Sequence, residues 1–151
     1  MPETPRGALK DTRSALGIIV HSGDVGRVHY ALALASSAAA VNTLAILFFT
    51  MGGLRALLKD RDGEPGWHAL SPGESGLPPA SWEKQLKERG AAGFAELLSA
   101  CAELGVTFMI CEMGLRAMGL SRRDLRSDIP YVEGGIVTML NETEDGKIVF
   151  V

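Results

Sequence analysis

The sequence predicts an α/β fold, a three-layer α/β/α sandwich around a mostly parallel sheet of about four to five strands. Short apolar runs at 16–20, 43–49 and 106–110 have the length and composition of strands that are buried on both faces. Stretches with helical periodicity separate these runs. Because helical crossovers connect parallel strands, this alternation is typical of a parallel sheet between two layers of helices.

The composition is that of an ordinary globular protein of about one domain in length. The 151 residues are 46% hydrophobic and 22% charged, with a formal net charge of −3. The densest basic stretch, 116–128, also contains acidic residues, so it lacks the clustered basic face that nucleic-acid binding needs. The longest apolar run, 44–54, is too short for a membrane span, and the amino terminus lacks the apolar core of a secretory signal. We therefore expect a cytoplasmic protein that binds neither nucleic acid nor membranes.

We expect residues 1–14 to form a flexible tail and residues 15–151 to form a single domain. The first predicted helix, 27–41, is rich in alanine and would pack closely on the sheet, with Ser22 or Asp24 as its cap. Further helices are predicted over 82–89 and 91–104, with a break near Gly90.

Residues 60–80 are predicted to form a long irregular loop. They contain four prolines and four glycines, and this density of helix and strand breakers excludes a long regular element. We expect a solvent-exposed crossover. In the alternative, Trp67 and Leu70 anchor the loop to a partner or to the body of the domain.

The last third of the chain has weaker signals. A short helix is predicted over 113–118, closed by Gly119 in a left-handed conformation. Residues 129–135 interrupt the regular structure, and 136–143 are ambiguous between strand and helix. A final strand is predicted over 147–151, after an Asp-Gly turn.

The two cysteines are predicted to differ in role. Cys101 lies near the end of a predicted helix and Cys111 at the end of the next strand, which places their sulfur atoms roughly 14 Å apart along the axis. A disulfide needs Cα atoms within about 7 Å, so we expect none, and Cys101 is interpreted as a small buried hydrophobe. No His, Cys or Asp set has the spacing of a metal site, so we expect no metal.

Cys111 is the candidate catalytic residue. It follows a predicted strand and begins a predicted helix, the position at which α/β folds place their sites. Free N–H groups at a helix start favour a thiolate, which is nucleophilic. On position alone, an inert cysteine at a strand end is the alternative. If the first strand neighbours the third, His21 would approach Cys111 as a proton acceptor; otherwise it faces solvent.

Several stretches resemble the DsrE/DsrF-like family, and in particular the branch often labelled peroxiredoxin-like DsrE. The sequence Cys111-Glu-Met-Gly-Leu-Arg-Ala-Met-Gly119 is similar to the family's Cys-x-Met-Ser-x-x-x-Met-Gly stretch. Ser22-Gly-Asp24, residues 48–54, and Asp124-Leu125 followed by residues 132–140 also agree, in order. The resemblance covers most of 16–141 and implies a helix over 132–142.

The resemblance implies a role in sulfur trafficking. In this family the cysteine carries sulfur as a persulfide and passes it to a partner, which makes Cys111 the candidate carrier, with sulfur donor and acceptor proteins as partners. It also implies a homo-oligomer, a trimer or hexamer. Two departures stand out, because Gly114 replaces the family's usual serine and Met51-Gly52-Gly53 replaces its common aromatic residues. The alternative is a non-catalytic oligomeric interaction module with an inert Cys111.

Further candidate binding residues follow the strands at the same predicted edge. Hydroxyl and backbone donors there would hold a thiolate, a persulfide or a small anion. Capping is the alternative for Ser22 and Asp24, and packing is the alternative for the methionines. The loops match no dinucleotide or P-loop pattern, so we expect no cofactor. The candidates are Ser22, Gly23, Asp24, Thr50, Met51, Met113 and Gly114.

Overall fold

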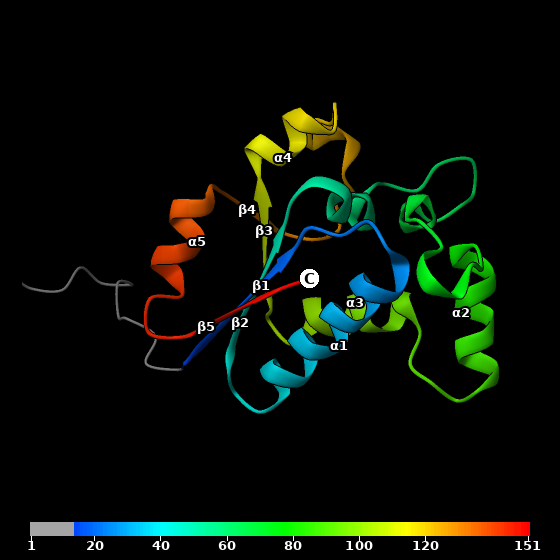
Figure 1. The fold of residues 1–151 in the computed structure, drawn as a ribbon, viewed down its shortest axis with the longest axis horizontal. Helices are drawn as coiled ribbons and strands as arrows, with labels where there is room; N and C mark the ends of the chain where they lie inside the picture. Colours follow the sequence, from blue (N-terminus) through cyan, green and yellow to red (C-terminus); the bar gives the residue numbers. More distant parts are fainter. Residues whose placement is uncertain (1–13) are drawn as a thin grey trace, which may run out of the picture.

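The computed structural model describes residues 14–151. Five parallel strands form one sheet in the order β4-β3-β2-β1-β5, with helices on both faces (Figure 1). This confirms the predicted fold class. The predicted tail, except for Ser14, lies outside the described residues. The strands are β1 Ala15–Val20, β2 Leu44–Phe49, β3 Thr107–Cys111, β4 Tyr131–Gly134 and β5 Lys147–Phe150.

The helices begin and end close to the predicted residues. Asp24 is the N-cap of the first helix, where its carboxylate accepts hydrogen bonds from the N–H groups of Gly26 at 2.8 Å and Arg27 at 3.2 Å. Gly119 has a φ of 67° and ends the fourth helix, as predicted. The helices are α1 Val25–Ala40, α2 Pro79–Glu88, α3 Phe94–Glu103, α4 Glu112–Ala117 and α5 Ile136–Glu142, with short 3-10 turns at Met51–Leu57, Gly66–Ala69, Gly73–Ser75 and Arg122–Asp124.

The two faces of the sheet carry cores of different size. Side chains of alternate strand residues, such as Phe49, Phe108 and Ile110, pack with α1 and α3 in the larger core. The opposite face holds a small cluster of Ile46, Phe48, Met109, Cys111 and Met139. Figure 1 shows α5 on this second side, away from α1 and α3. Within the described part of the chain, one short helix, α5, therefore covers the second face.

Most of the segment 60–80 is exposed, but the structure bears out the alternative to a loose crossover, since Trp67 and Leu70 anchor the segment to the body of the domain. The side chains of Trp67 and Leu70 are buried in the larger core, and the ring of Trp67 stacks on Phe94 with centroids 4.4 Å apart. The Ser71 N–H also donates to the Gly23 carbonyl at 2.8 Å. The prolines and glycines do exclude long regular structure, but burial of a tryptophan stabilises enough to hold an irregular segment against the domain.

The region 129–135 contains a strand that we did not predict. Among the five described strands, β4 forms an edge of the sheet and pairs with β3 alone. Consequently α5 begins at Ile136, and the helix implied over 132–142 is wrong for residues 132–134. Both Val132 and Glu133 are exposed, so this short edge strand shows no buried apolar run and no alternation between apolar and polar residues.

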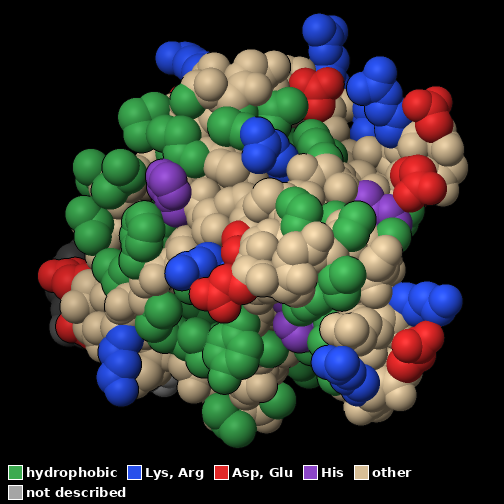
Figure 2. Space-filling model, turned by 45° about the vertical axis from the view of Figure 1, so that its right-hand side comes forward, with side chains coloured by type: hydrophobic (Ala, Val, Ile, Leu, Met, Phe, Trp, Pro, Cys, Tyr) green, Lys and Arg blue, Asp and Glu red, His purple; other side chains and the backbone are tan. Residues whose placement is uncertain are grey.

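The surface shown in Figure 2 mixes charges of both signs. Lys and Arg side chains are scattered among Asp and Glu side chains, with patches of hydrophobic side chains between them. Within residues 14–151, no helix has both the length and the apolar character needed to cross a membrane.

Candidate functional site

Cys111 lies where β3 ends and α4 begins. It is the last residue of the strand and the N-cap of the helix. Its side chain is buried, and Sγ accepts a hydrogen bond from the Gly114 N–H at 3.4 Å. Because the N–H groups in a first helical turn have no partner within the helix, the sulfur satisfies one of them in the way that a capping oxygen does.

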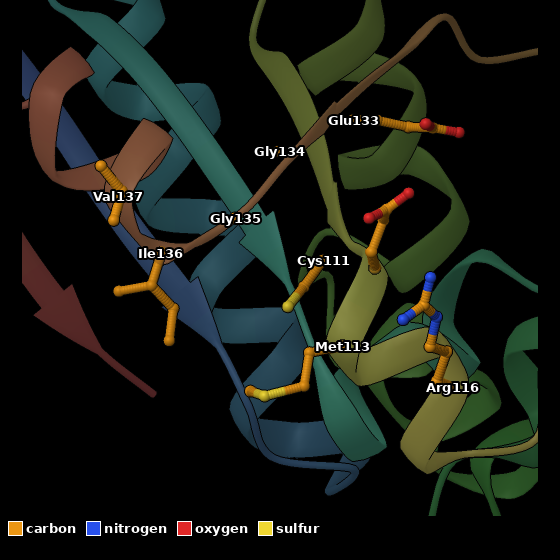
Figure 3. Close-up of a pocket in the computed structure, with 9 residues that line it drawn as sticks. Cys111, Met113, Arg116, Glu133, Gly134, Gly135, Ile136 and Val137 are labelled. Carbon is orange, nitrogen blue, oxygen red and sulfur yellow. The ribbon is translucent and has the colours of Figure 1, made fainter.

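The thiol forms part of the wall of a pocket of about 620 Å³ (Figure 3). In Figure 3 the Cys111 sulfur points between Met113 and Ile136. The parallel pairing of Cys111 with Gly134 brings the end of β4 and the start of α5 beside the thiol. Two segments therefore line the pocket. They are residues of α4, Glu112, Met113 and Arg116, and residues of the β4–α5 junction, Glu133, Gly134, Gly135, Ile136 and Val137.

The pocket wall carries one cation that is not neutralised. Glu133 is paired with Arg122, whose Nη1 lies 2.7 Å from Oε1. Arg116 forms no ion pair among the described residues, although Glu112 precedes it by four residues on the same helix. In an apolar pocket of this kind, a free guanidinium is available to an anion that enters.

Cys101 lies in a different environment. It is fully buried in the larger core, and its S–H donates to the Leu32 carbonyl at 3.3 Å. Burial raises the pKa of the Cys101 thiol to about 12. Both cysteines are free, as predicted, and Cys101 has the properties of a packed, unreactive thiol.

Comparison with known proteins identifies the family. Residues 68–151, more than half of the chain, match the DsrE/DsrF/DrsH-like family. The chain belongs to this family. The match confirms the resemblance seen in the sequence. The matched residues of this DsrE-like protein include β3, Cys111, and both segments that line the pocket.

Sulfur carrier protein DsrE2 of Allochromatium vinosum is 27% identical over 135 residues, and the match covers 77% of this DsrE-like chain and 85% of that protein. Two solved structures are similar. A protein of unknown function, MTH1491 from Methanobacterium thermoautotrophicum, has 17% identity and a TM-score of 0.58, and the ychN protein from E. coli has 15% identity and a TM-score of 0.54. Each covers 93% of this chain and 100% of the other. At these identities the two structures show a common fold alone.

Gly114, the departure from the DsrE family's serine, has a steric cause. A Cβ atom at this position would lie 2.5 Å from Thr50 Oγ1 and 2.9 Å from the Met51 nitrogen. Both distances are shorter than nonbonded contacts allow, so the turn after β2 leaves no room for a side chain. Met51 itself has a φ of 47°, an uncommon conformation for a residue with a side chain. Thr50, Met51 and Gly114 therefore form one tightly packed junction between the end of β2 and the first turn of α4.

The first loop of the DsrE-like domain lies at the same edge of the sheet but does not reach the pocket. Asp24 caps α1, and Ser22 Oγ accepts from the Asp24 N–H at 3.0 Å. The Gly23 carbonyl accepts hydrogen bonds from Ser71. All three residues thus take part in local capping and in holding the segment 60–80, and none lines the pocket beside Cys111.

His21 is not beside Cys111. β2 lies between β1 and β3, so the condition on which that prediction depended is not met. The imidazole packs instead against Phe150, with ring centroids 5.4 Å apart. The sequence alone does not reveal strand order, because the order depends on which strands the crossovers bring together.

Most of the residues that line the pocket were not predicted from the sequence. Glu112 follows Cys111 directly, and Arg116 lies one helical turn after Glu112, so their spacing is a sequence signal that places both beside the thiol. Residues 133–137 carry no such sequence signal, because they reach the thiol only through the pairing of β4 with β3.

Proposed function

We propose that this DsrE-like protein carries sulfur on Cys111 as a persulfide. The observation that carries the proposal is the placement of the Cys111 sulfur, which accepts the Gly114 N–H and forms part of the pocket wall. An N–H donor stabilises sulfur that bears negative charge, and a thiolate is the form that attacks. The name of the relative from Allochromatium vinosum, a sulfur carrier protein, supports the same function.

The reaction consists of two thiol–disulfide-type exchanges. The Cys111 thiolate attacks the sulfane sulfur of a donor, and a new S–S bond forms while the donor's S–S bond breaks. The donor leaves as an anion with the electron pair of the broken bond. An acceptor thiolate then attacks the outer sulfur, and Cys111 leaves as the thiolate. Electrons balance in each step, so no oxidant is consumed.

The pocket residues have distinct roles in this proposal. Arg116 attracts an anionic donor such as thiosulfate and helps the departing anion to leave. The apolar side chains of Met113, Ile136 and Val137 surround the entrance and limit the access of water to the persulfide. Thr50 and Met51 support the first turn of α4 from behind. Ser22, Gly23 and Asp24 hold the first loop and the segment 60–80 in place.

Intact mass spectrometry after exposure to thiosulfate tests the function. Wild type and Cys101→Ala are expected to gain one sulfur atom, which a reducing agent removes. Cys111→Ala is expected to gain none, because the nucleophile is absent. Cys101→Ala is the matched control, since it also lacks one buried thiol. The proposal fails if wild type gains no sulfur, or if Cys111→Ala gains as much as wild type.

A second candidate function is an oligomeric interaction module, and an exposed apolar surface favours it. We call this surface the α5–β5 face. Its large apolar side chains are between 42% and 70% exposed. Large exposed apolar patches on soluble proteins usually mark sites of contact with another molecule. The occupant we propose is a second copy of this chain. The α5–β5 face consists of Ile136, Val137, Leu140, Ile148 and Phe150.

Light scattering coupled to size-exclusion chromatography tests the assembly. Wild type is expected to have the mass of a multimer, and Val137→Asp is expected to shift it toward the monomer because a charge cannot be buried without a partner. Val41→Asp is the matched control, since Val41 is 76% exposed at the end of α1 and outside the α5–β5 face. A monomeric wild type, or equal effects of both variants, would contradict the assembly.

A further inference from the structure

Thr50 lies beside Cys111 at the edge of the sheet. In the parallel pairing of β2 with β3, Phe48 is opposite Met109 and Phe49 is opposite Ile110. The backbone of Thr50 remains extended, with φ −145° and ψ 160°. One further step in this register therefore places Thr50 next to Cys111, at the spacing of neighbouring strands, about 4.8 Å.

The side chain of Thr50 belongs to the face of the sheet that carries the thiol. Side chains alternate along an extended strand, and Phe48, two residues earlier, shares the second-face cluster with Met109 and Cys111. The contact with α4 agrees with this direction, because Thr50 Oγ1 fills the place of the side chain that Gly114 lacks. Gly114 is the residue whose N–H holds the sulfur.

The hydroxyl of Thr50 has no hydrogen-bond partner among the described residues. Thr50 is only 6% exposed as a residue, but its hydroxyl oxygen is not one of the fully enclosed polar atoms without a partner. The hydroxyl can therefore bond to solvent in the reduced protein and exchange that bond for one to a group that reaches it. Among residues 14–151, only the Gly114 N–H bonds to the sulfur of Cys111. A donor on the correct face is thus present beside the thiol but not used.

We propose that the Thr50 hydroxyl donates a hydrogen bond to the outer sulfur of the Cys111 persulfide. This inference rests on the proposed function. An S–S bond is about 2.05 Å long, so a persulfide extends beyond the thiol sulfur toward groups that the thiol does not reach. The outer sulfur is anionic at neutral pH, and hydrogen bonds to ionised groups are the stronger ones. The Thr50 hydroxyl thereby stabilises the anionic form of the persulfide. The absence of a side chain at Gly114 leaves the space that this hydroxyl occupies.

The pH profile of the persulfide tests the role of Thr50. The protein is loaded with thiosulfate, and the rate at which iodoacetamide alkylates the outer sulfur is measured against pH. Thr50→Val keeps the shape and removes the donor, so its profile is expected to move up by about one pH unit, a tenfold change in the protonation equilibrium. Thr50→Ser keeps the donor and is expected to follow wild type. Thermal unfolding of all three proteins reports whether folding is preserved.

A variant of Gly114 tests the same geometry independently. Gly114→Ala inserts a Cβ into the place of the hydroxyl, so it is expected to move the profile in the same direction. In the Thr50→Val background it is expected to add no further shift, since the two changes disrupt one interaction. Equal profiles for wild type and Thr50→Val, or equal shifts for Thr50→Val and Thr50→Ser, overturn the role of Thr50 while the carrier function stands. A wild type that cannot be loaded overturns both.

Discussion

Cys101 and Cys111 are both buried, yet their hydrogen bonds run in opposite directions. The S–H of Cys101 donates to the Leu32 carbonyl, whereas the sulfur of Cys111 accepts from the Gly114 N–H. The two thiols therefore differ in the direction of their hydrogen bonds, although both are buried. The proposed carrier role of Cys111 rests on a sulfur that accepts.

The surroundings of the two thiols follow from the two faces of the sheet. Cys101 lies in the larger core among side chains of α1 and α3. Cys111 lies on the second face, where α5 covers a smaller cluster and leaves a pocket at the edge of the sheet. The lightly covered face is thus the one on which a thiol can meet another molecule.

Selective alkylation gives the largest expected contrast between the two cysteines. With a pKa raised to about 12, only about one Cys101 thiol in 10⁵ is ionised at pH 7. We expect iodoacetamide to add once to the folded protein, at Cys111. Cys111→Ala should stay unlabelled over the same period, whereas Cys101→Ala should be labelled at the wild-type rate.

Denaturant supplies the control for that experiment. In urea both cysteines are exposed, so wild type should take two labels and each single variant one. If folded Cys111→Ala were labelled as fast as folded Cys101→Ala, the contrast between the two thiols would be wrong.

The strands and helices that the sequence predicts well are those with strong local signals. Buried strands such as β2 are continuous apolar runs, and their partners need not be known to recognise them. The capping role of Asp24 and the placement of Cys111 between strand and helix likewise depend on neighbours in sequence. These local features were enough to predict the fold class and to direct attention to Cys111.

What the sequence did not predict depends on long-range contacts. β4 has no apolar run, and it exists because β3 supplies its hydrogen bonds. The burial of Trp67 depends on Phe94, which lies far along the chain. The same holds at the site, where Gly114 replaces the family's usual serine. Thr50 Oγ1 and the Met51 nitrogen lie close to where a side chain at position 114 would begin, and this approach depends on the pairing of β2 with β3.

The pH dependence of stability gives a smaller effect that separates the same two thiols. Burial raises the pKa of Cys101 from 9.0 to about 12 in the folded protein. Below pH 9 the thiol is protonated in both folded and unfolded states, so stability does not change. Above pH 9 the unfolded chain loses the proton while the folded protein keeps it, and stability falls as pH rises. At pH 11 the loss from Cys101 is at most about 3 kcal/mol.

Urea unfolding between pH 8 and pH 11 measures this loss. Wild type and Cys111→Ala are expected to lose stability in parallel, because both retain Cys101. Cys101→Ala is expected to lose less, since it lacks the thiol whose ionisation favours the unfolded chain. Burial also raises the pKa of Tyr131 to about 12, but all three proteins share that contribution, so it cancels in the differences. Parallel curves for wild type and Cys101→Ala would show that Cys101 is not held in its protonated form, and the contrast with Cys111 would then rest on the pocket alone.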